Sequence, residues 1–174
     1  MSRHSAYLNS RPGGVRLQCR GDDFSDLKLD GSVFDDAILP GCSFASTSLQ
    51  GAQFLRADLF GSDFTRSDLT KTVFDRADLR GANFLMAVLK KTSFRQADLR
   101  PGQIMQHVKD DDGVNKEKRQ DVPVNMSGAN LEEANLGHAH LDHANMTNAN
   151  AMNATFVGAS LFAANLTGAD LSGA

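Results

Sequence analysis

Large apolar residues recur along this chain with a period of five. Phenylalanine occupies every tenth position from Phe24 to Phe94, and leucine stands midway between successive phenylalanines. After a gap the pattern returns and runs from Leu131 to Leu171, with Met, Ala or Phe at some positions. We call these the core positions. Two residues before almost every core position lies Ala, Ser, Thr or Cys, so a small residue recurs in the same register.

Neither an α-helix nor a flat strand accommodates this period. On a helix a step of five residues advances about 500°, so the large side chains would not form one apolar face. On a flat strand, residues five apart point to opposite faces, and half of the core residues would face water. Residues two apart do share a face, so the small and the core residue can both point inward if the chain turns a corner after each unit. The spacing therefore predicts a β-solenoid with its core inside and its coils about 4.8 Å apart.

The individual units read, for example, ADLFG, SDFTR, ADLRG, ANFLM, ANLEE and ADLSG. They resemble the pentapeptide repeat family, whose consensus is roughly A(D/N)LXX. The resemblance implies an all-β fold, a right-handed quadrilateral β-helix with four pentapeptides per coil. About 26 repeats would then form six to seven coils, a rod about 30 Å long. Residues twenty apart would stack, so we expect two phenylalanine ladders on opposite faces, one beginning at Phe24 and the other at Phe34.

Two segments fall outside the repeat. Residues 1–14 end in Pro-Gly-Gly and are expected to form a flexible lead-in. Residues 107–123, HVKDDDGVNKEKRQDVP, are charged and lack apolar periodicity. If Ile104 and Met126 are consecutive core residues, these residues form a loop inserted into one solenoid, whose two repeat segments are 15–106 and 124–174.

Insertions in solenoids form loops on one face, often the binding face. The charged loop is therefore the candidate contact with a partner, and a linker without a role is the alternative. Its candidate contact residues are Lys109, Asp110, Asp111, Asp112, Lys116, Lys118 and Arg119.

Composition and charge narrow the classes of function. The formal net charge of -3 creates no field that would attract nucleic acid or an anionic membrane, so no direct nucleic-acid contact is expected. The sequence has no run of 18 apolar residues, and we expect no membrane span. The absence of an apolar signal segment and the presence of only two cysteines, Cys19 and Cys42, favour the cytoplasm.

The polar residues fit a structural role better than a catalytic one. Three aspartates recur twenty residues apart, just before core positions, where short polar side chains cap backbone groups at turns: Asp58, Asp78 and Asp98. Three histidines lie off the core positions and are expected on the surface: His138, His140 and His143. The sequence contains none of the common phosphate-binding, dinucleotide-binding, zinc-protease or nucleophile-elbow motifs. We therefore expect no enzyme activity, no metal and no cofactor.

The sequence favours a non-catalytic structural or protein-interaction module with an unknown protein partner. The family resemblance implies an alternative, because some pentapeptide repeat proteins mimic duplex DNA and bind DNA gyrase or topoisomerase IV, which gives quinolone resistance. Residues 15–100 hold 12 acidic and 12 basic residues, whereas residues 124–174 hold four acidic and no basic residues. DNA carries one charge per about 1.7 Å of its axis, so this chain is a weak match to DNA.

The C-terminal coil is a further candidate for an interaction, besides the charged loop. An uncovered solenoid end exposes backbone groups and core side chains, here around Leu161, Leu166 and Leu171. The sequence therefore predicts an end-to-end homodimer through this coil, or a further part of the protein that covers it.

Overall fold

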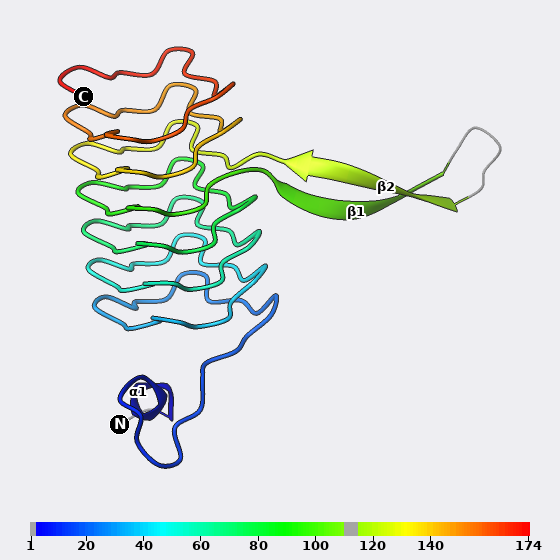
Figure 1. The fold of residues 1–174 in the computed structure, drawn as a ribbon, viewed down its shortest axis with the longest axis vertical. Helices are drawn as coiled ribbons and strands as arrows, with labels where there is room; N and C mark the ends of the chain where they lie inside the picture. The colour runs from blue at the N-terminus through cyan, green and yellow to red at the C-terminus, as the bar shows by residue number, and fades with distance from the viewer. Residues whose placement is uncertain (1–2, 110–114) are drawn as a thin grey trace.

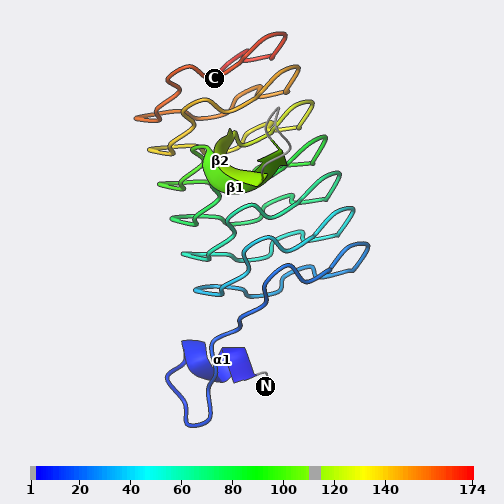
Figure 2. The same cartoon turned by 90° about the vertical axis from the view of Figure 1, so that its right-hand side faces the viewer.

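The chain forms one solenoid from whose side a hairpin stands out (Figure 1). The structure is a computed structural model and describes residues 3–109 and 115–174. Four-sided coils stack along a single axis, with the N-terminal helix near one end and the C-terminus at the other (Figure 2). The named elements are α1 (Arg3–Leu8), β1 (Gly102–Lys109) and β2 (Asn115–Val122).

Short parallel bridges between residues twenty apart hold the coils together. The bridging residue is the one just before each core position, as in the pairs of Asp58 with Ile38 below it and Asp78 above it. On each face of a coil, backbone N–H and C=O groups form hydrogen bonds with the neighbouring coils along the axis. Leu59 N, for example, donates to Asp78 O at 2.8 Å, and Asp78 N donates to Ala57 O at 2.9 Å. The predicted coil of four five-residue units is confirmed by this ladder.

The chain turns at a corner position, two residues after each core position. The corner residues of the repeats have positive φ, for instance 64° at Gly61 and 57° at Arg66. A hydrogen bond such as that from Ala37 N to Phe34 O, 3.0 Å, closes each turn. Glycine is frequent at these corners because it adopts positive φ without steric cost, and Val, Ile and Thr, which adopt it least readily, do not occur there.

The predicted phenylalanine ladders fill the core of the first repeat segment. Along one ladder the rings of Phe44, Phe64 and Phe84 stack, with centroids 5.1 and 5.0 Å apart. The second ladder meets the first edge to face, as between Phe54 and Phe64, whose centroids are 6.1 Å apart at 86°. All of these rings are fully buried. Stacked rings within a ladder and edge-to-face rings between ladders are both favoured geometries, so the two ladders form one continuous aromatic core.

The hairpin begins where a proline occupies a corner position. In the same column of corners, four glycines have positive φ: Gly21, Gly41, Gly61 and Gly81. Pro101 is the next member of this column, and its ring fixes φ near -65°, so the chain cannot turn there and leaves the coil. It returns at Val124, because Asn83 bridges to Asn125, 42 residues on instead of 20, an excess of 22 residues.

The excursion is therefore longer than the sequence predicted. It spans residues 102–123, rather than 107–123, and forms an antiparallel pair that runs from Gly102 opposite Val122 to Lys109 opposite Asn115. The expectation that Ile104 is a core residue is wrong. Ile104 lies on β1 and is 39% exposed. Met126 is the first core residue of the second repeat segment, and Ile104 does not precede it in the core.

The N-terminal segment also differs from the expected flexible lead-in, since residues Arg3–Leu8 form α1. His4 is buried between this helix and the chain that leads into the first coil. Its Nδ1 accepts a hydrogen bond from Leu17 N at 3.0 Å. This hydrogen bond joins the helix to the chain that leads into the first coil.

Candidate protein-interaction surface

The hairpin is the main departure from the regular rod, and it projects away from the coils (Figures 1 and 2). Of the predicted contact residues, Lys118 and Arg119 lie on β2 and are exposed. The backbone of Lys109 belongs to β1 and that of Lys116 to β2. The remaining three, Asp110, Asp111 and Asp112, lie outside the described residues. The structure thus brings the described members of the set onto one two-stranded element.

The two strands differ sharply in charge. The sequence of β2, NKEKRQDV, contains five charged residues, whereas β1, GQIMQHVK, contains only the lysine at its far end. On β1 the apolar side chains of Ile104 and Met105 are 39% and 52% exposed. Charged side chains, lysine above all, discourage the pairing of an edge strand with another chain. β2 therefore carries this protection and β1 lacks it.

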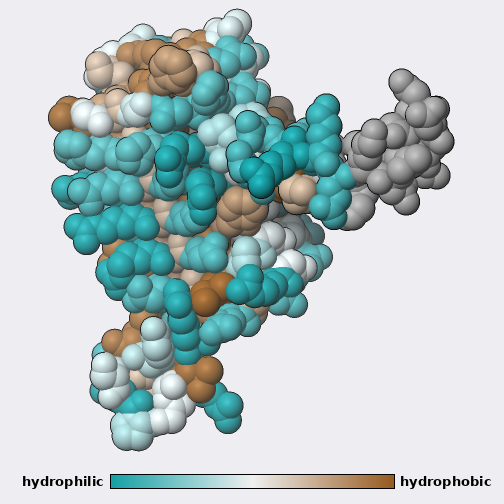
Figure 3. Space-filling view, turned by 45° about the vertical axis from the view of Figure 1, so that its right-hand side comes forward, coloured by the Kyte–Doolittle hydropathy of each residue, from teal (hydrophilic) through white to brown (hydrophobic). Residues whose placement is uncertain are grey.

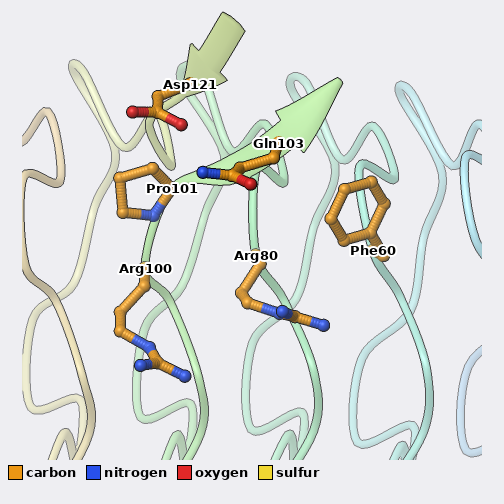
Figure 4. Close-up of a pocket in the computed structure, with 6 residues that line it drawn as sticks. All are labelled: Phe60, Arg80, Arg100, Pro101, Gln103 and Asp121. Atoms are coloured by element: carbon orange, nitrogen blue, oxygen red, sulfur yellow. The ribbon is translucent and has the colours of Figure 1, made fainter. Parts of the chain in front are cut away.

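A cavity of about 440 Å³ lies at the base of the hairpin (Figure 4). Its wall on the rod comprises Phe60, Arg80 and Arg100, which occupy the same position in successive coils. Its wall on the hairpin comprises Gln103 and Asp121, which are cross-strand partners, and Pro101 completes the lining. The cavity thus joins the side of the rod to the first residues of the hairpin.

Two arginine–aspartate pairs determine the electrostatics of this cavity. Arg80 donates to Asp78 through Nε and Nη2, at 2.9 and 2.6 Å, and Arg100 donates to Asp98 in the same way at 2.9 and 2.7 Å. These hydrogen bonds raise the pKa of both guanidinium groups. Burial acts to raise the pKa of Asp98, but the hydrogen bonds from Arg100 and the positive charges of Arg100 and Arg80 together outweigh it, so that pKa lies below its usual value.

The groups that line the cavity are more basic than its surroundings. The lining contains two guanidinium groups and one carboxylate, whereas Asp78 and Asp98 are not part of it. Among the described residues, both arginines keep their Nη1 groups without an internal hydrogen-bond partner. Arg80 also lies over the ring of Phe60, 5.6 Å from its centroid. The cavity therefore presents free N–H donors beside an aromatic ring.

The cavity was not predicted from the sequence. Phe60 could have been identified from the sequence, because it is a large aromatic residue at an outward position, where polar residues are usual. The hairpin base was missed because Pro101 and Gly102 were counted as part of a regular repeat. A Cβ at Gly102 would lie 3.1 Å from Arg80 O and 3.1 Å from the Phe60 ring, so a larger residue would require the hairpin or the ring to shift by a few tenths of an ångström.

The histidines show no metal-binding arrangement. Among residues 3–109 and 115–174, no group of three or more His, Cys, Asp or Glu side chains is placed to hold a metal ion. His143 instead packs edge to face against Phe162, with ring centroids 5.7 Å apart. Within the same residues no helix is long and apolar enough to cross a membrane.

The C-terminal coil is the most apolar end of the rod, as Figure 3 shows. Val157 and Phe162 are apolar residues at outward positions, and they are 70% and 73% exposed. On earlier coils the amide of each core residue donates to the next coil, as Met146 N does to Asn165 O at 2.8 Å. In the described chain the amides of Phe156 and Leu161 have no such acceptor.

The chain belongs to the pentapeptide repeat family. The model of the family, "Pentapeptide repeats", matches it in eight copies over residues 28–66, 57–96, 125–161 and 149–174. These matches cover both repeat segments and leave the hairpin out. A comparison with curated proteins gives no match. No catalytic family is indicated.

Solved structures of pentapeptide repeat proteins share the fold. Two trypsin-treated forms of QnrB1, a plasmid-mediated fluoroquinolone resistance protein, each align with a TM-score of 0.52. They are 19% and 17% identical to this chain, over 91% of it and 72% and 74% of their own lengths. Rfr23 from the cyanobacterium Cyanothece 51142 is 17% identical over 88% of this chain and 87% of its own, with a TM-score of 0.44. The family match and the shared fold confirm the predicted right-handed β-helix.

Proposed function

We propose that this chain is a non-catalytic protein-interaction module that contacts its partner through the hairpin. The observation that carries this proposal is the hairpin itself, an ordered pair of strands that projects from an otherwise regular rod. The interior of the rod is filled by phenylalanine, leucine and alanine side chains, which leaves the outer surface as the place for recognition. A rigid rod holds such a projecting element in a fixed orientation, and this lowers the entropy cost of binding.

The charged residues of the hairpin are the proposed contacts, with Lys118 and Arg119 as its described and exposed members. Residues 107–123 carry four basic and five acidic side chains, so the hairpin has little net charge. Closely mixed charges of both signs favour a protein surface with a complementary pattern over the uniformly negative backbone of a nucleic acid.

The proposal is tested by excising the hairpin. Removal of residues 102–123 joins residue 101 directly to Val124, and the added change Pro101→Gly restores a residue that can turn the corner. We expect the intact protein to retain a partner from a lysate that both the excised variant and the pair Lys118→Glu and Arg119→Glu fail to retain. Arg66→Glu, at a corner of the rod, is the matched control. Retention of the same partner by all variants would contradict the proposal.

A second candidate function is modulation of DNA gyrase or topoisomerase IV. The fold is shared with QnrB1, and the second repeat segment has four acidic and no basic residues. The neutral first segment argues against a mimic of DNA along the whole rod. A gyrase supercoiling assay with and without a fluoroquinolone tests this function. Protection or inhibition at low micromolar protein supports it, and unchanged supercoiling excludes it.

We also propose that the C-terminal coil binds a second copy of the chain. The support is the combination of an exposed core side chain on the last coil, Leu171, with backbone amides that lack acceptors in the described chain. Another coil end could supply both apolar cover and hydrogen-bond partners.

A further inference from the structure

We infer that the outer edge of β1 and the cavity at its base form one docking groove for the free C-terminus of a partner protein, bound as an added β-strand. This inference rests on the proposed function and concerns one segment of the partner: its C-terminal residues bind at β1, whereas the charged contacts Lys118 and Arg119 on β2 meet another part of the same partner. The groove is defined by the backbone of residues 103–108 and by the lining residues Phe60, Arg80 and Arg100.

The outer edges of the hairpin are open. β1 and β2 pair only with each other, and no backbone hydrogen bond links either strand to another part of the described chain. The outer edge of each strand therefore offers unpaired N–H and C=O groups, which is the template that strand addition uses. Five charged residues on β2 disfavour its edge, whereas residues 102–108 of β1 contain no Asp, Glu, Lys or Arg.

Apolar side chains lie beside the edge of β1. Ile104 and Met105 are consecutive on β1, so they lie on opposite faces of the two-stranded sheet. Both are exposed, at 39% and 52%. A strand added at 4.8 Å would place its own side chains against both of them, and apolar pairs of this kind stabilise neighbouring strands. The edge is thus suited to a peptide with apolar or β-branched residues.

The position of the cavity at the base of β1 determines the direction of the bound peptide. β1 leaves the rod at Gly102, which abuts Phe60 and Arg80, and runs outward (Figure 1). Phe60 and Arg80 lie on the side of β1 that faces away from β2 (Figure 4). A strand antiparallel to β1 runs towards the rod and brings its carboxyl end into the cavity, whereas a parallel strand would bring its amino end there.

Arginine side chains line the end of the groove that lies against the rod. Two guanidinium groups and one carboxylate line the cavity, and the arginine Nη1 groups have no internal partner in the described chain. Hydrogen bonds from arginine to a carboxylate are among the stronger ones in proteins. The Nη1 N–H donors can be satisfied by a terminal carboxylate, which accepts hydrogen bonds, and not by a terminal ammonium group, which only donates them. Asp121, on the β2 side, and the carboxylates of Asp78 and Asp98, which already pair with the two guanidinium groups, oppose the carboxylate and should limit the affinity.

The experiment is a selection from random seven-residue peptides with free C-termini, displayed to the full chain. We expect selected peptides to lose at least tenfold in affinity when their C-termini are amidated. Arg80→Gln combined with Arg100→Gln should cause a similar loss, and Asp121→Asn should increase affinity. The pair Arg66→Gln and Lys71→Gln, at corners elsewhere on the rod, is the matched control and should leave affinity unchanged.

Amide hydrogen exchange supplies a readout that a simple ion pair would not give. Bound peptide should slow exchange at alternate amides of residues 103–108 and leave β2 unchanged. Selection of no ligand, indifference to amidation, or protection of β2 instead of β1 would each overturn the inference. Because amidation changes only the peptide, its result does not depend on how well any variant folds. If excision of the hairpin abolishes capture of a partner but no peptide is selected, this inference fails and the proposed function stands.

Discussion

At the scale of single residues, the corner positions show how local geometry selects the sequence. Each corner needs positive φ, which costs a non-glycine residue about 1–2 kcal/mol. The repeats meet this need with glycine, with Asn or Asp, and elsewhere with unbranched side chains such as Met86 and Lys91. Packing of the adjacent core residues evidently compensates this cost at the non-glycine corners.

Gly61 isolates the cost of the corner conformation, because its φ is 64° and a Cβ there would meet nothing within 4 Å. Gly61→Val should therefore destabilise the protein by about 1–2 kcal/mol through backbone strain alone. Gly61→Asn is the control and should cost less, since Asn adopts the left-handed region more readily. Urea unfolding measures both, and equal losses for the two variants would contradict this reading of the corner.

The aromatic core gives the largest expected effect of a single substitution. The Phe64 ring is fully buried and touches both neighbours of its own ladder and two rings of the other. Phe64→Ala should cost about 3–5 kcal/mol because it removes these contacts and leaves a cavity. Phe64→Leu, the residue that fills core positions in the adjacent units, should cost markedly less. A small effect of the alanine variant in thermal unfolding would contradict the continuous ladder.

At the scale of elements, the hairpin is explained by one residue that cannot turn a corner. The sequence indicated an interruption, and its charged residues marked the far part of the hairpin. Its beginning was misplaced because Gly102 and Ile104 match the repeat in composition, whereas Pro101 is excluded by conformation. A check of φ requirements at each corner, in addition to the apolar period, would have placed the boundary correctly.

Excision of the hairpin tests whether it stabilises the rod. The variant that lacks residues 102–123 and carries Pro101→Gly restores the spacing of twenty residues between Asn83 and the following bridge residue. We expect its melting temperature to change little, since the hairpin has no backbone hydrogen bonds to the described coils and a shorter connection costs less entropy. The same excision with Pro101 retained is the control and should be less stable. A large loss for the glycine variant would show that the hairpin supports the rod.

At the scale of the whole molecule, the repeat specifies the architecture almost completely. The period of five, the small residues and the phenylalanine spacing predicted the coil, the ladders and the inward residues, because each depends only on local chain geometry. The cavity at the hairpin base could not be predicted in this way. It depends on where a non-repeating segment leaves the rod and on how closely Gly102 approaches Phe60, and neither is periodic.

Association of the whole chain should depend on its C-terminal coil. Sedimentation equilibrium at several concentrations is expected to show a dimer, and Leu171→Asp should shift it to monomer, because a charge would be buried in the contact between the coil ends. Leu171 is 38% exposed on the last coil, so the substitution should change the melting temperature of the monomer little. Met86→Asp, at another exposed apolar side chain, is the matched control. A clean monomer at high concentration would contradict the proposed contact.

The central claim is that the hairpin is the partner-binding element of a rod that is otherwise a support. The most direct measurement is the affinity of a captured partner for the intact chain and for the excised Pro101→Gly variant, titrated by calorimetry under the same conditions. Our account predicts that excision lowers the affinity at least a hundredfold while the melting temperature is retained. Equal affinity of the two proteins would contradict it and would place recognition on the coils.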